Sequence, residues 1–457
     1  MVILVDSFDM YSDLWPCFFS VFKKQWPDCP YDVKLVSNEK KFPGIDTIAV
    51  GEETCWSERT LKAVKQLDSD YVRKVSESDF MKKEKKIGIA TVYTGFNYGS
   101  ALQAFATKTI LSRMGYEAQV LKLKGSIIPG RDIRIKKLSS ILFRSLIHSG
   151  GLKSLKNYGD SISKEMPEKS KEGFNHFINE KIKPRFVSYG EIKKEAESYH
   201  AFLCGSDQVW NSAVFYVDPF YYLQFAPEDK RVAFAPSFGR DFIPDYNKKI
   251  IKKYISSIPH LSVREESGIA LIEDLTGKKA EHILDPTLIM SKNEWEESLC
   301  LGSEKSEKYI LAYFLDVPSH KAQKAVEEIS EKYGLKIISL PYSFQGSQWN
   351  EYLESAGPLE FVKYIKNAEF VCTDSFHGTA FALNFNIPFF TFERDYKNAG
   401  KQSARIESIL KLTEMEERYE PEATEKCLEI DFARSNEILI MQREKAREYL
   451  TGALNER

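Results

Sequence analysis

The chain has 457 residues, of which 43% are hydrophobic, and it carries a formal net charge of -2 at pH 7. Single hydrophobic cores rarely grow beyond about 250 to 300 residues, so this length predicts two or three separate cores. The near-neutral charge gives no general attraction to nucleic acid or to an anionic membrane. Small anionic or sugar-like ligands, met by a few placed cations, are therefore the expected partners.

The cysteines and the N-terminus predict a cytoplasmic protein. Seven cysteines are scattered along the chain, and none is spaced like a zinc knuckle or a redox pair, so we expect buried, reduced thiols. Asp6 and Asp9 interrupt the apolar start where a signal peptide would need a continuous apolar core. No run approaches the roughly 20 apolar residues of a membrane span, so we expect no integral membrane segment.

Residues 1–75 predict a small, incomplete α/β segment. A strand at 1–7 is followed by a helix at 14–26, strands at 31–38 and 46–51, and a helix at 57–72. This segment is too short to complete a sheet with its own site. Its D-x-D pair, Asp68 and Asp70, lies at a helix end and does not follow a strand, so we predict no metal site. Residues 76–85 are polar and charge-rich, as in a linker.

Residues 86–300 predict a first Rossmann-like domain. An apolar strand, a glycine-containing turn, a helix with an apolar face and a stop at Gly115 form one βαβ unit within residues 86–125. Residues 125–199 are basic and then amphipathic, and predict helices that cover the sheet. Apolar strands resume within four later stretches, 199–211, 230–239, 260–268 and 280–290.

Residues 301–420 predict a second Rossmann-like domain. Strands at 309–316, 336–343, 369–378 and 388–394 alternate with helices at 320–335, 358–368 and 379–387. Residues 421–457 predict a long helix that packs back across the first domain. The expected fold class is α/β, with two parallel domains facing each other. The crevice at the carboxyl ends of their strands is then the expected ligand site.

Two polar stretches of the first domain are candidates for binding sugar hydroxyls. The first βα turn lacks the glycine spacing of a dinucleotide-binding or ATP-binding loop, but its helix N-terminus exposes backbone N–H groups. A second loop places hydrogen-bonding side chains beside a tryptophan that could stack on a pyranose ring. The acceptor-binding candidates are Asn97, Tyr98, Gly99, Ser100, Asp207, Gln208, Trp210 and Asn211.

The stretch "VCTDSFHGTA", residues 371–380, contains the strongest catalytic candidate, His377. The histidine follows an apolar strand and precedes a helix that we expect to start near Thr379. An imidazole there can exchange protons near neutral pH, and Asp374 is a candidate to orient it. Asp374, Ser375 and His377 are too close along one strand end to assume a relay triad.

Arginines at other strand ends can supply positive charge to the crevice. Arg264 ends an apolar strand and suits a carboxylate or phosphate, although its acidic neighbours Glu265 and Glu266 could also pair with it. Lys401 and Arg405 lie beyond the last parallel strand and could add charge from the opposite side.

Six ordered motifs resemble those of the polysaccharide pyruvyl transferase family. They lie within about residues 86–415 and read "GFNYGSALQAFA", "FLCGSDQVWN", "APSFG", "SVREESG", "ILDPTLIM" and "TDSFHGTAFALNFNIPF". The resemblance implies two Rossmann-like domains arranged as in GT-B glycosyltransferases. It also implies phosphoenolpyruvate as donor, without a further cofactor, and a glycan or lipid-linked sugar as acceptor, with a pyruvate ketal as product. Peripheral association with a glycan-assembly machinery would follow. Residues 1–75 are similar instead to the start of a bacterial nucleotide-sugar glycosyltransferase.

The resemblance also assigns roles to individual residues. The family histidine falls on His377 and the family arginine after the "S-V-R" strand falls on Arg264, both associated with donor binding and proton transfer. A further family arginine matches Arg394 or Arg405, of which we prefer Arg405. With Asp374 added to the catalytic group, the predicted donor-binding residues are Arg264, Arg405, Ser375 and Lys401.

Two alternatives remain open from the sequence. A GT-B-type glycosyltransferase that uses a nucleotide sugar would share the architecture and would explain the front segment. A non-catalytic glycan-binding protein would bind an acceptor without turnover.

Overall fold

The computed structural model describes residues 2–6, 15–25, 32–51, 85–124, 166–214, 216–302, 307–340, 353–394, 404–422 and 424–455. The chain forms two compact units. The first comprises residues 1–84 with 293–302, and the second comprises residues 85–292 with 303–457. The predicted helix at 57–72 and the basic stretch at 125–165 lie outside the described residues.

The first unit contains a small parallel sheet. Its elements are β1 (Val2–Asp6), α1 (Trp15–Gln25), β2 (Asp32–Ser37) and β3 (Asp46–Ala49), with strand order β1-β2-β3. The helix buries Trp15 and Phe19 against Leu35 of the sheet, because these aromatic residues recur at helical spacing. Helix α12 (Lys292–Leu299) also falls largely in this unit. The predicted start of this segment, with the order strand, helix, strand, strand, is confirmed.

The N-terminal half of the second unit is a five-stranded parallel sheet with the order β6-β5-β4-β7-β8. Its strands are β4 (Lys86–Ala90), β5 (Glu117–Leu123), β6 (Arg185–Val187), β7 (Ala201–Cys204) and β8 (Arg231–Ala233). Helix α4 (Tyr98–Arg113) connects β4 to β5, and the chain turns at Gly115 with a φ of +86°. The predicted βαβ unit is thus confirmed.

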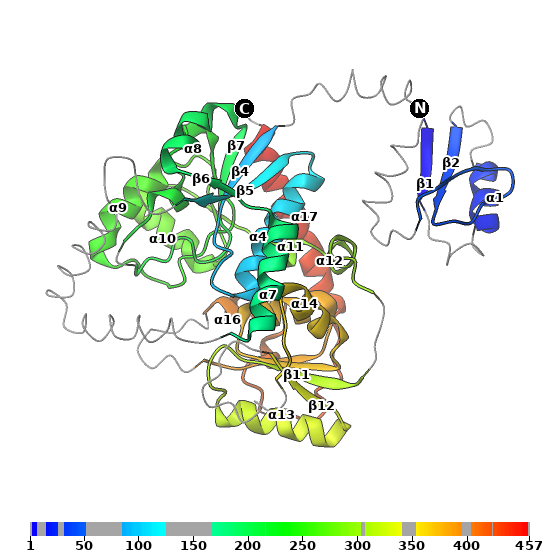
Figure 1. The fold of residues 1–457 in the computed structure, drawn as a ribbon. Coiled ribbons are helices and arrows are strands. Elements are labelled where there is room, and N and C mark those ends of the chain that lie inside the picture. The colour runs from blue at the N-terminus through cyan, green and yellow to red at the C-terminus, as the bar shows by residue number, and fades with distance from the viewer. Residues whose placement is uncertain are drawn as a thin grey trace. The chain divides into compact units, whose positions relative to one another are not determined.

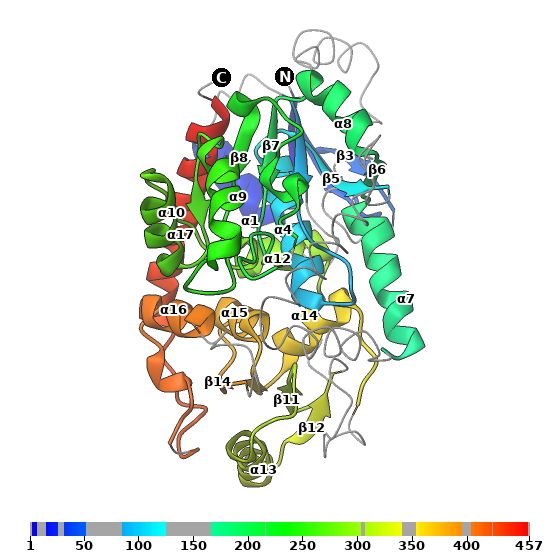
Figure 2. The ribbon, with the colours of Figure 1, turned by 90° about the vertical axis from the view of Figure 1, so that its left-hand side faces the viewer.

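Short elements follow this sheet and lead to the other half. A two-stranded parallel pair joins β9 (Ser262–Val263) to β10 (Glu281–His282), and the four-residue helix α11 (Pro286–Ile289) comes next. The surrounding helices are α7 (Glu168–Phe177), α8 (Tyr189–Glu195), α9 (Asp245–Ser256) and α10 (Glu266–Thr276). Figures 1 and 2 show α9 and α10 on the side of the five-stranded sheet where β7 and β8 lie.

The C-terminal half is a four-stranded parallel sheet with the order β12-β11-β13-β14. The strands are β11 (Tyr309–Tyr313), β12 (Lys336–Ser339), β13 (Phe370–Thr373) and β14 (Phe389–Thr391). The helices are α13 (His320–Tyr333), α14 (Pro358–Asn367), α15 (Phe376–Phe385), α16 (Ala404–Leu412) and α17 (Ala433–Asn455). With two parallel sheets and their crossover helices, the predicted α/β class with two Rossmann-like domains is confirmed.

Helix α15 starts earlier than the sequence predicts. Its N-cap is Ser375, whose side chain accepts a hydrogen bond from the Gly378 backbone N–H at 3.4 Å, so Phe376 and not Thr379 is the first helical residue. The prediction of a start near Thr379 was wrong because a serine cap can begin a helix only two residues after a strand. His377 therefore lies in the first helical turn, which limits where its side chain can point.

The two halves of the second unit pack on each other through helices (Figure 2). Tyr98 of α4 stacks on Phe361 of α14, with ring centroids 4.7 Å apart and an interplanar angle of 8°. Its hydroxyl donates a hydrogen bond to the Ala356 carbonyl at 3.0 Å. Helix α17 packs back on the five-stranded sheet, where the Tyr449 hydroxyl donates a hydrogen bond to the Ala233 carbonyl of β8 at 2.7 Å. Within the described residues, no helix is both long and apolar enough to span a membrane.

Candidate active site

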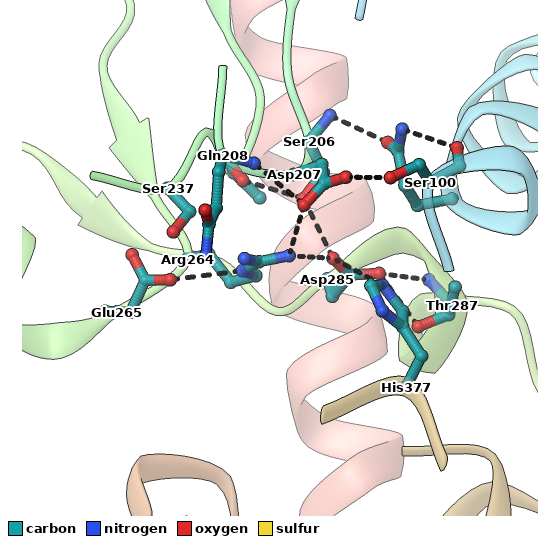
Figure 3. A network of polar contacts seen from close by, with 12 residues as sticks. Ser100, Ser206, Asp207, Gln208, Ser237, Arg264, Glu265, Asp285, Thr287 and His377 are labelled. Atoms are coloured by element: carbon teal, nitrogen blue, oxygen red, sulfur yellow. Dashed lines mark hydrogen bonds and ion pairs between the residues drawn. The ribbon is translucent and has the colours of Figure 1, made fainter. Parts of the chain in front are cut away.

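Charged side chains from both halves of the second unit meet in one buried cluster (Figure 3). Asp207 follows β7, Arg264 follows β9, Asp285 caps α11, and His377 comes from the first turn of α15. These positions are all strand ends or helix starts, where side chains can leave the sheet and reach the space beyond it. The cluster is assembled from residues that are far apart in the sequence.

Arg264 occupies the centre of this cluster and is only 4% exposed. Its Nη1 donates to Asp285 Oδ2 at 2.7 Å and lies 3.9 Å from Asp207 Oδ1, and its Nε donates to Glu265 Oε1 at 3.2 Å. Burial acts to lower the pKa of the guanidinium, but the three carboxylates outweigh it and raise the pKa above its ordinary value. Arg264 therefore stays charged, and one of its nitrogens, the buried Nη2, has no hydrogen-bond partner among the described residues.

Asp285 connects the arginine to the imidazole. Its Oδ1 accepts hydrogen bonds from the backbone N–H and the hydroxyl of Thr287, at 3.0 and 2.8 Å, and its Oδ2 accepts one from Ser206 Oγ at 3.0 Å. Burial acts to raise the pKa of this carboxyl, but Arg264 and His377 outweigh that effect and the pKa is lower than usual. Asp285 is therefore ionised near neutral pH and fixed in position.

The imidazole of His377 faces this carboxylate without bonding to it. Nε2 lies 3.8 Å from Asp285 Oδ2, which is beyond hydrogen-bond distance, and this buried atom has no hydrogen-bond partner in the described part of the chain. Burial lowers the pKa of His377, against the opposing effect of Asp285 and Asp207. The imidazole is then mostly neutral at pH 7.

Gly99 of α4 provides the surface against which the imidazole lies. A Cβ added at this glycine would lie 1.9 Å from His377 Nδ1, far inside any real contact. Only a residue without a side chain leaves room for the ring at this point. The glycine that the sequence predicts as an acceptor contact thus positions the histidine.

Asp207 and Gln208 extend the cluster toward helices α4 and α16. Asp207 adopts a left-handed backbone with a φ of 57°, and its Oδ2 accepts a hydrogen bond from Ser100 Oγ at 2.5 Å. With its amide oxygen turned toward α16, Gln208 accepts hydrogen bonds from both terminal nitrogens of Arg405, at 2.9 and 3.0 Å. Arg405 therefore joins the same site as Arg264.

A small pocket lies beside this cluster, between Arg264 and Arg405. It is lined by both arginines together with Asp285 and Phe376, whose ring centroid lies 4.9 Å from the Arg264 guanidinium carbon. Its volume of about 10 Å³ is that of a site for a single water molecule. A larger ligand would have to displace side chains of the pocket on entering.

Asp374 does not orient His377, and this prediction was wrong. Its carboxylate accepts hydrogen bonds from the backbone N–H groups of Leu315 and Asp316, at 2.6 and 3.2 Å, and from Arg394 Nε at 3.3 Å. These bonds hold the loop that follows β11. The carboxylate beside His377 is that of Asp285. Of the two candidate arginines, Arg394 pairs with Asp374, whereas Arg405 lines the same pocket as Arg264.

Tyr98 and Trp210 were also predicted wrongly as acceptor contacts. Tyr98 is fully buried between the two halves of the unit. Trp210 is 0% exposed, stacks on Tyr222 with centroids 5.3 Å apart, and donates its indole N–H to the Tyr221 carbonyl. Because both rings are fully buried, they stabilise the core and expose no face on which a sugar could stack.

The remaining predicted residues have local roles or fall outside the described residues. The side chain of Asn97 accepts from the Ser100 N–H as the N-cap of α4, and that of Asn211 accepts from the Ala213 N–H. Ser375 caps α15. Lys401 lies outside the residues that the structure describes.

Asp285 is the functional candidate that the sequence reasoning missed. The signal was present in "ILDPTLIM", where an acidic residue follows an apolar run and precedes a proline that starts a helix. The pattern is typical of an N-cap, and an N-cap aspartate needs no further role. Only the approach of Arg264 and His377 in space distinguishes it from a cap.

Residues 97–396 match the model of a family described as polysaccharide pyruvyl transferase, and the match includes parts of both halves of the second unit. A search of the curated proteins finds no match.

Similar solved structures include UDP-N-acetylglucosamine 2-epimerase from Rickettsia bellii, with 11% identity, a TM-score of 0.34 and coverage of 80% of this chain and 98% of that one. MurG of Acinetobacter baumannii has 9% identity, a TM-score of 0.37 and coverage of 81% and 100%. The N-terminal domain of Candida albicans trehalose-6-phosphate phosphatase has 8% identity, a TM-score of 0.40 and coverage of 81% and 97%.

Proposed function

Because the chain belongs to the polysaccharide pyruvyl transferase family, we propose that it transfers a pyruvyl group from phosphoenolpyruvate to two hydroxyls of a glycan or lipid-linked sugar. The product is a cyclic pyruvate ketal, and inorganic phosphate is released. The observation that supports this most is that His377 and Arg264 lie on either side of the Asp285 carboxylate (Figure 3), next to a pocket that Arg264 and Arg405 both line.

The two arginines suit the two anionic ends of the donor. Arg264 Nη2 is buried and lacks a hydrogen-bond partner among the described residues, so it is available to a carboxylate or phosphate oxygen. Arg405 reaches the same pocket from α16 and is held there by Gln208. A planar donor held at both ends presents one face of its double bond to the acceptor.

His377 is the group placed to move protons. In the proposed reaction a proton is added to the methylene carbon of the donor from the imidazolium of His377 or a water that it binds. The first sugar hydroxyl forms a bond to the adjacent carbon, C2, and gives its proton back to the imidazole. The bond from C2 to the phosphate oxygen then breaks, and the second hydroxyl closes the ketal while its proton leaves with the phosphate. One proton is thus gained by carbon and one by phosphate, which balances the two hydroxyls.

The charge balance of the site links donor binding to protonation of His377. Two arginines face three carboxylates, those of Asp207, Glu265 and Asp285, so the empty site is not positive while His377 is neutral. An anionic donor then binds best together with a proton on the imidazole. Donor binding would therefore produce the acid that the first step needs.

The test is direct detection of turnover. Purified protein is incubated with phosphoenolpyruvate and candidate glycans, and phosphate release and product mass are followed. Replacement of His377 by Ala should lower the rate at least about 100-fold, while Arg264→Lys should weaken donor binding strongly because a point charge does not replace a planar fork. Binding of UDP or GDP with no response to phosphoenolpyruvate would instead indicate a nucleotide-sugar glycosyltransferase.

A further inference from the structure

A second pocket lies at the carboxyl edge of the five-stranded sheet, and it is separate from the small pocket that Arg264 and Arg405 line. It has a volume of about 190 Å³, enough for a single sugar ring. Its walls come from the segments that follow β4 and end β5, and from the turn at Asp218. The lining residues include Thr91, Tyr93, Lys122, Asp218 and Tyr221.

The lining combines aromatic rings with charged and hydroxyl groups, which is the chemistry that sugars need. Tyr93 and Tyr221 bring ring faces and hydroxyls, and neither hydroxyl has a hydrogen-bond partner within the described ranges. Asp218 contributes a carboxylate to the lining, and this carboxylate also accepts a hydrogen bond from the Phe220 N–H at 3.0 Å. Aromatic faces pack on the apolar face of a pyranose, and polar groups around them bind its hydroxyls.

Lys122 adds a positive charge to this lining. Its ammonium lies 5.5 Å from the ring centroid of Tyr93, and no carboxylate of the described residues lies within ion-pair distance of it. A cation held over a ring at a pocket wall, without an acidic partner, is available to an anionic ligand.

The pocket is connected to the proposed active site by a short set of hydrogen bonds. Gln103 of α4 donates its side-chain N–H groups to Thr91 Oγ1 and to the Val92 carbonyl, at 2.9 and 2.7 Å. The oxygen of the same amide accepts from the Ser206 N–H at 3.1 Å, and Ser206 Oγ bonds Asp285. A ligand in this pocket is therefore held on the same rigid framework as Arg264 and His377.

Tyr221 lines this pocket. Burial, together with the nearby charges of Asp218 and Asp207, raises the pKa of Tyr221 to about 12. Its hydroxyl is therefore protonated at neutral pH and can donate a hydrogen bond to a sugar oxygen.

We propose that this pocket binds the acceptor sugar, and that Lys122 selects an acceptor carrying a negative group near the ring. This inference rests on the proposed pyruvyl transfer. The negative group is a carboxylate on the sugar or a phosphate at its anomeric carbon, and both offer oxygens that Lys122 can bind.

Calorimetry with three small probes tests the inference without turnover. The probes are methyl glucoside, methyl glucuronide and glucose 1-phosphate. At least one anionic probe should bind more tightly than methyl glucoside. Lys122→Gln should weaken binding of that anionic probe at least about tenfold and should change methyl glucoside binding by less than about threefold. The probe that responds identifies a carboxylate or a phosphate as the source of the charge.

Two further variants separate a specific contact from general effects. Lys124→Gln removes the same charge two residues along the chain, outside the pocket lining, and should leave all three affinities unchanged. Tyr221→Ala should weaken all three probes, with circular dichroism used to confirm that it folds. Equal losses in Lys124→Gln and Lys122→Gln, no loss in either, or no sugar binding by the wild type would overturn the inference.

Phosphoenolpyruvate binding, measured in parallel, distinguishes the two proposals. Lys122→Gln should bind phosphoenolpyruvate like the wild type. A wild type that binds the sugars at this pocket but not phosphoenolpyruvate would refute the pyruvyl transfer and leave the sugar pocket as a separate finding.

Discussion

Replacement of Gly99 by Ala tests whether the imidazole works where the structure places it. The new Cβ would lie 1.9 Å from His377 Nδ1 and 2.3 Å from Cγ and Cε1, whereas ordinary contacts begin near 3.4 Å. The ring must therefore move by about 1.5 Å, and a misplacement of about 1 Å can cost about 100-fold in rate. We expect phosphate release from phosphoenolpyruvate to fall at least that far.

The cost in stability should be smaller than the loss of activity. Overpacking in a filled site costs about 1–3 kcal/mol, while alanine in place of glycine within a helix gains about 0.5–1 kcal/mol. The free energy of unfolding in urea should thus fall by about 1–2 kcal/mol. In a His377→Ala background the clash disappears, so the same replacement should be neutral or stabilising.

Gly452→Ala is the matched control, because this glycine is also helical and an added Cβ there meets nothing within 4 Å. It should keep full activity. A Gly99→Ala protein that retains activity within about threefold of the wild type would show that the position of His377 does not matter, and the proposed role would be refuted.

Three further predictions concern charge, protonation and the core. Asp285→Asn should lower the free energy of unfolding by about 1–3 kcal/mol, since it replaces the charged acceptor of the Arg264 Nη1 hydrogen bond while Glu265 and Asp207 remain. A urea midpoint equal to that of the wild type would contradict this ion pair. The pKa of His377 is lowered in the empty site and should rise when an anion binds, so phosphoenolpyruvate affinity should fall as pH rises from about 6 to 8. Calorimetry of His377→Gln subtracts the donor's own titration, and an identical pH profile in both proteins would exclude proton uptake by the imidazole. Trp210→Phe should reduce thermal stability by disturbing the stack on Tyr222 and leave acceptor affinity unchanged; a selective loss of acceptor binding would restore the tryptophan as a ligand contact.

Local patterns were sufficient to predict the elements and the order in which they occur. The apolar period of residues 98–113, the stop at Gly115 and the proline at position 358 each act within one or two turns of chain. The parallel α/β class follows from their alternation. The strand ends at 204, 263 and 373 then identify the edge at which a site is built.

Which side chains reach that site was decided by the tertiary structure. Asp374 and Asp285 both follow apolar runs. Asp374 accepts a hydrogen bond from the loop after β11, whereas Asp285 pairs with Arg264 in the site. Trp210 belongs to the core because Tyr222 covers it, and Gly99 acts through a ring contributed by another helix. The direction of a side chain at a strand end depends on contacts between separate segments of the chain, and these contacts leave no periodic pattern in the sequence.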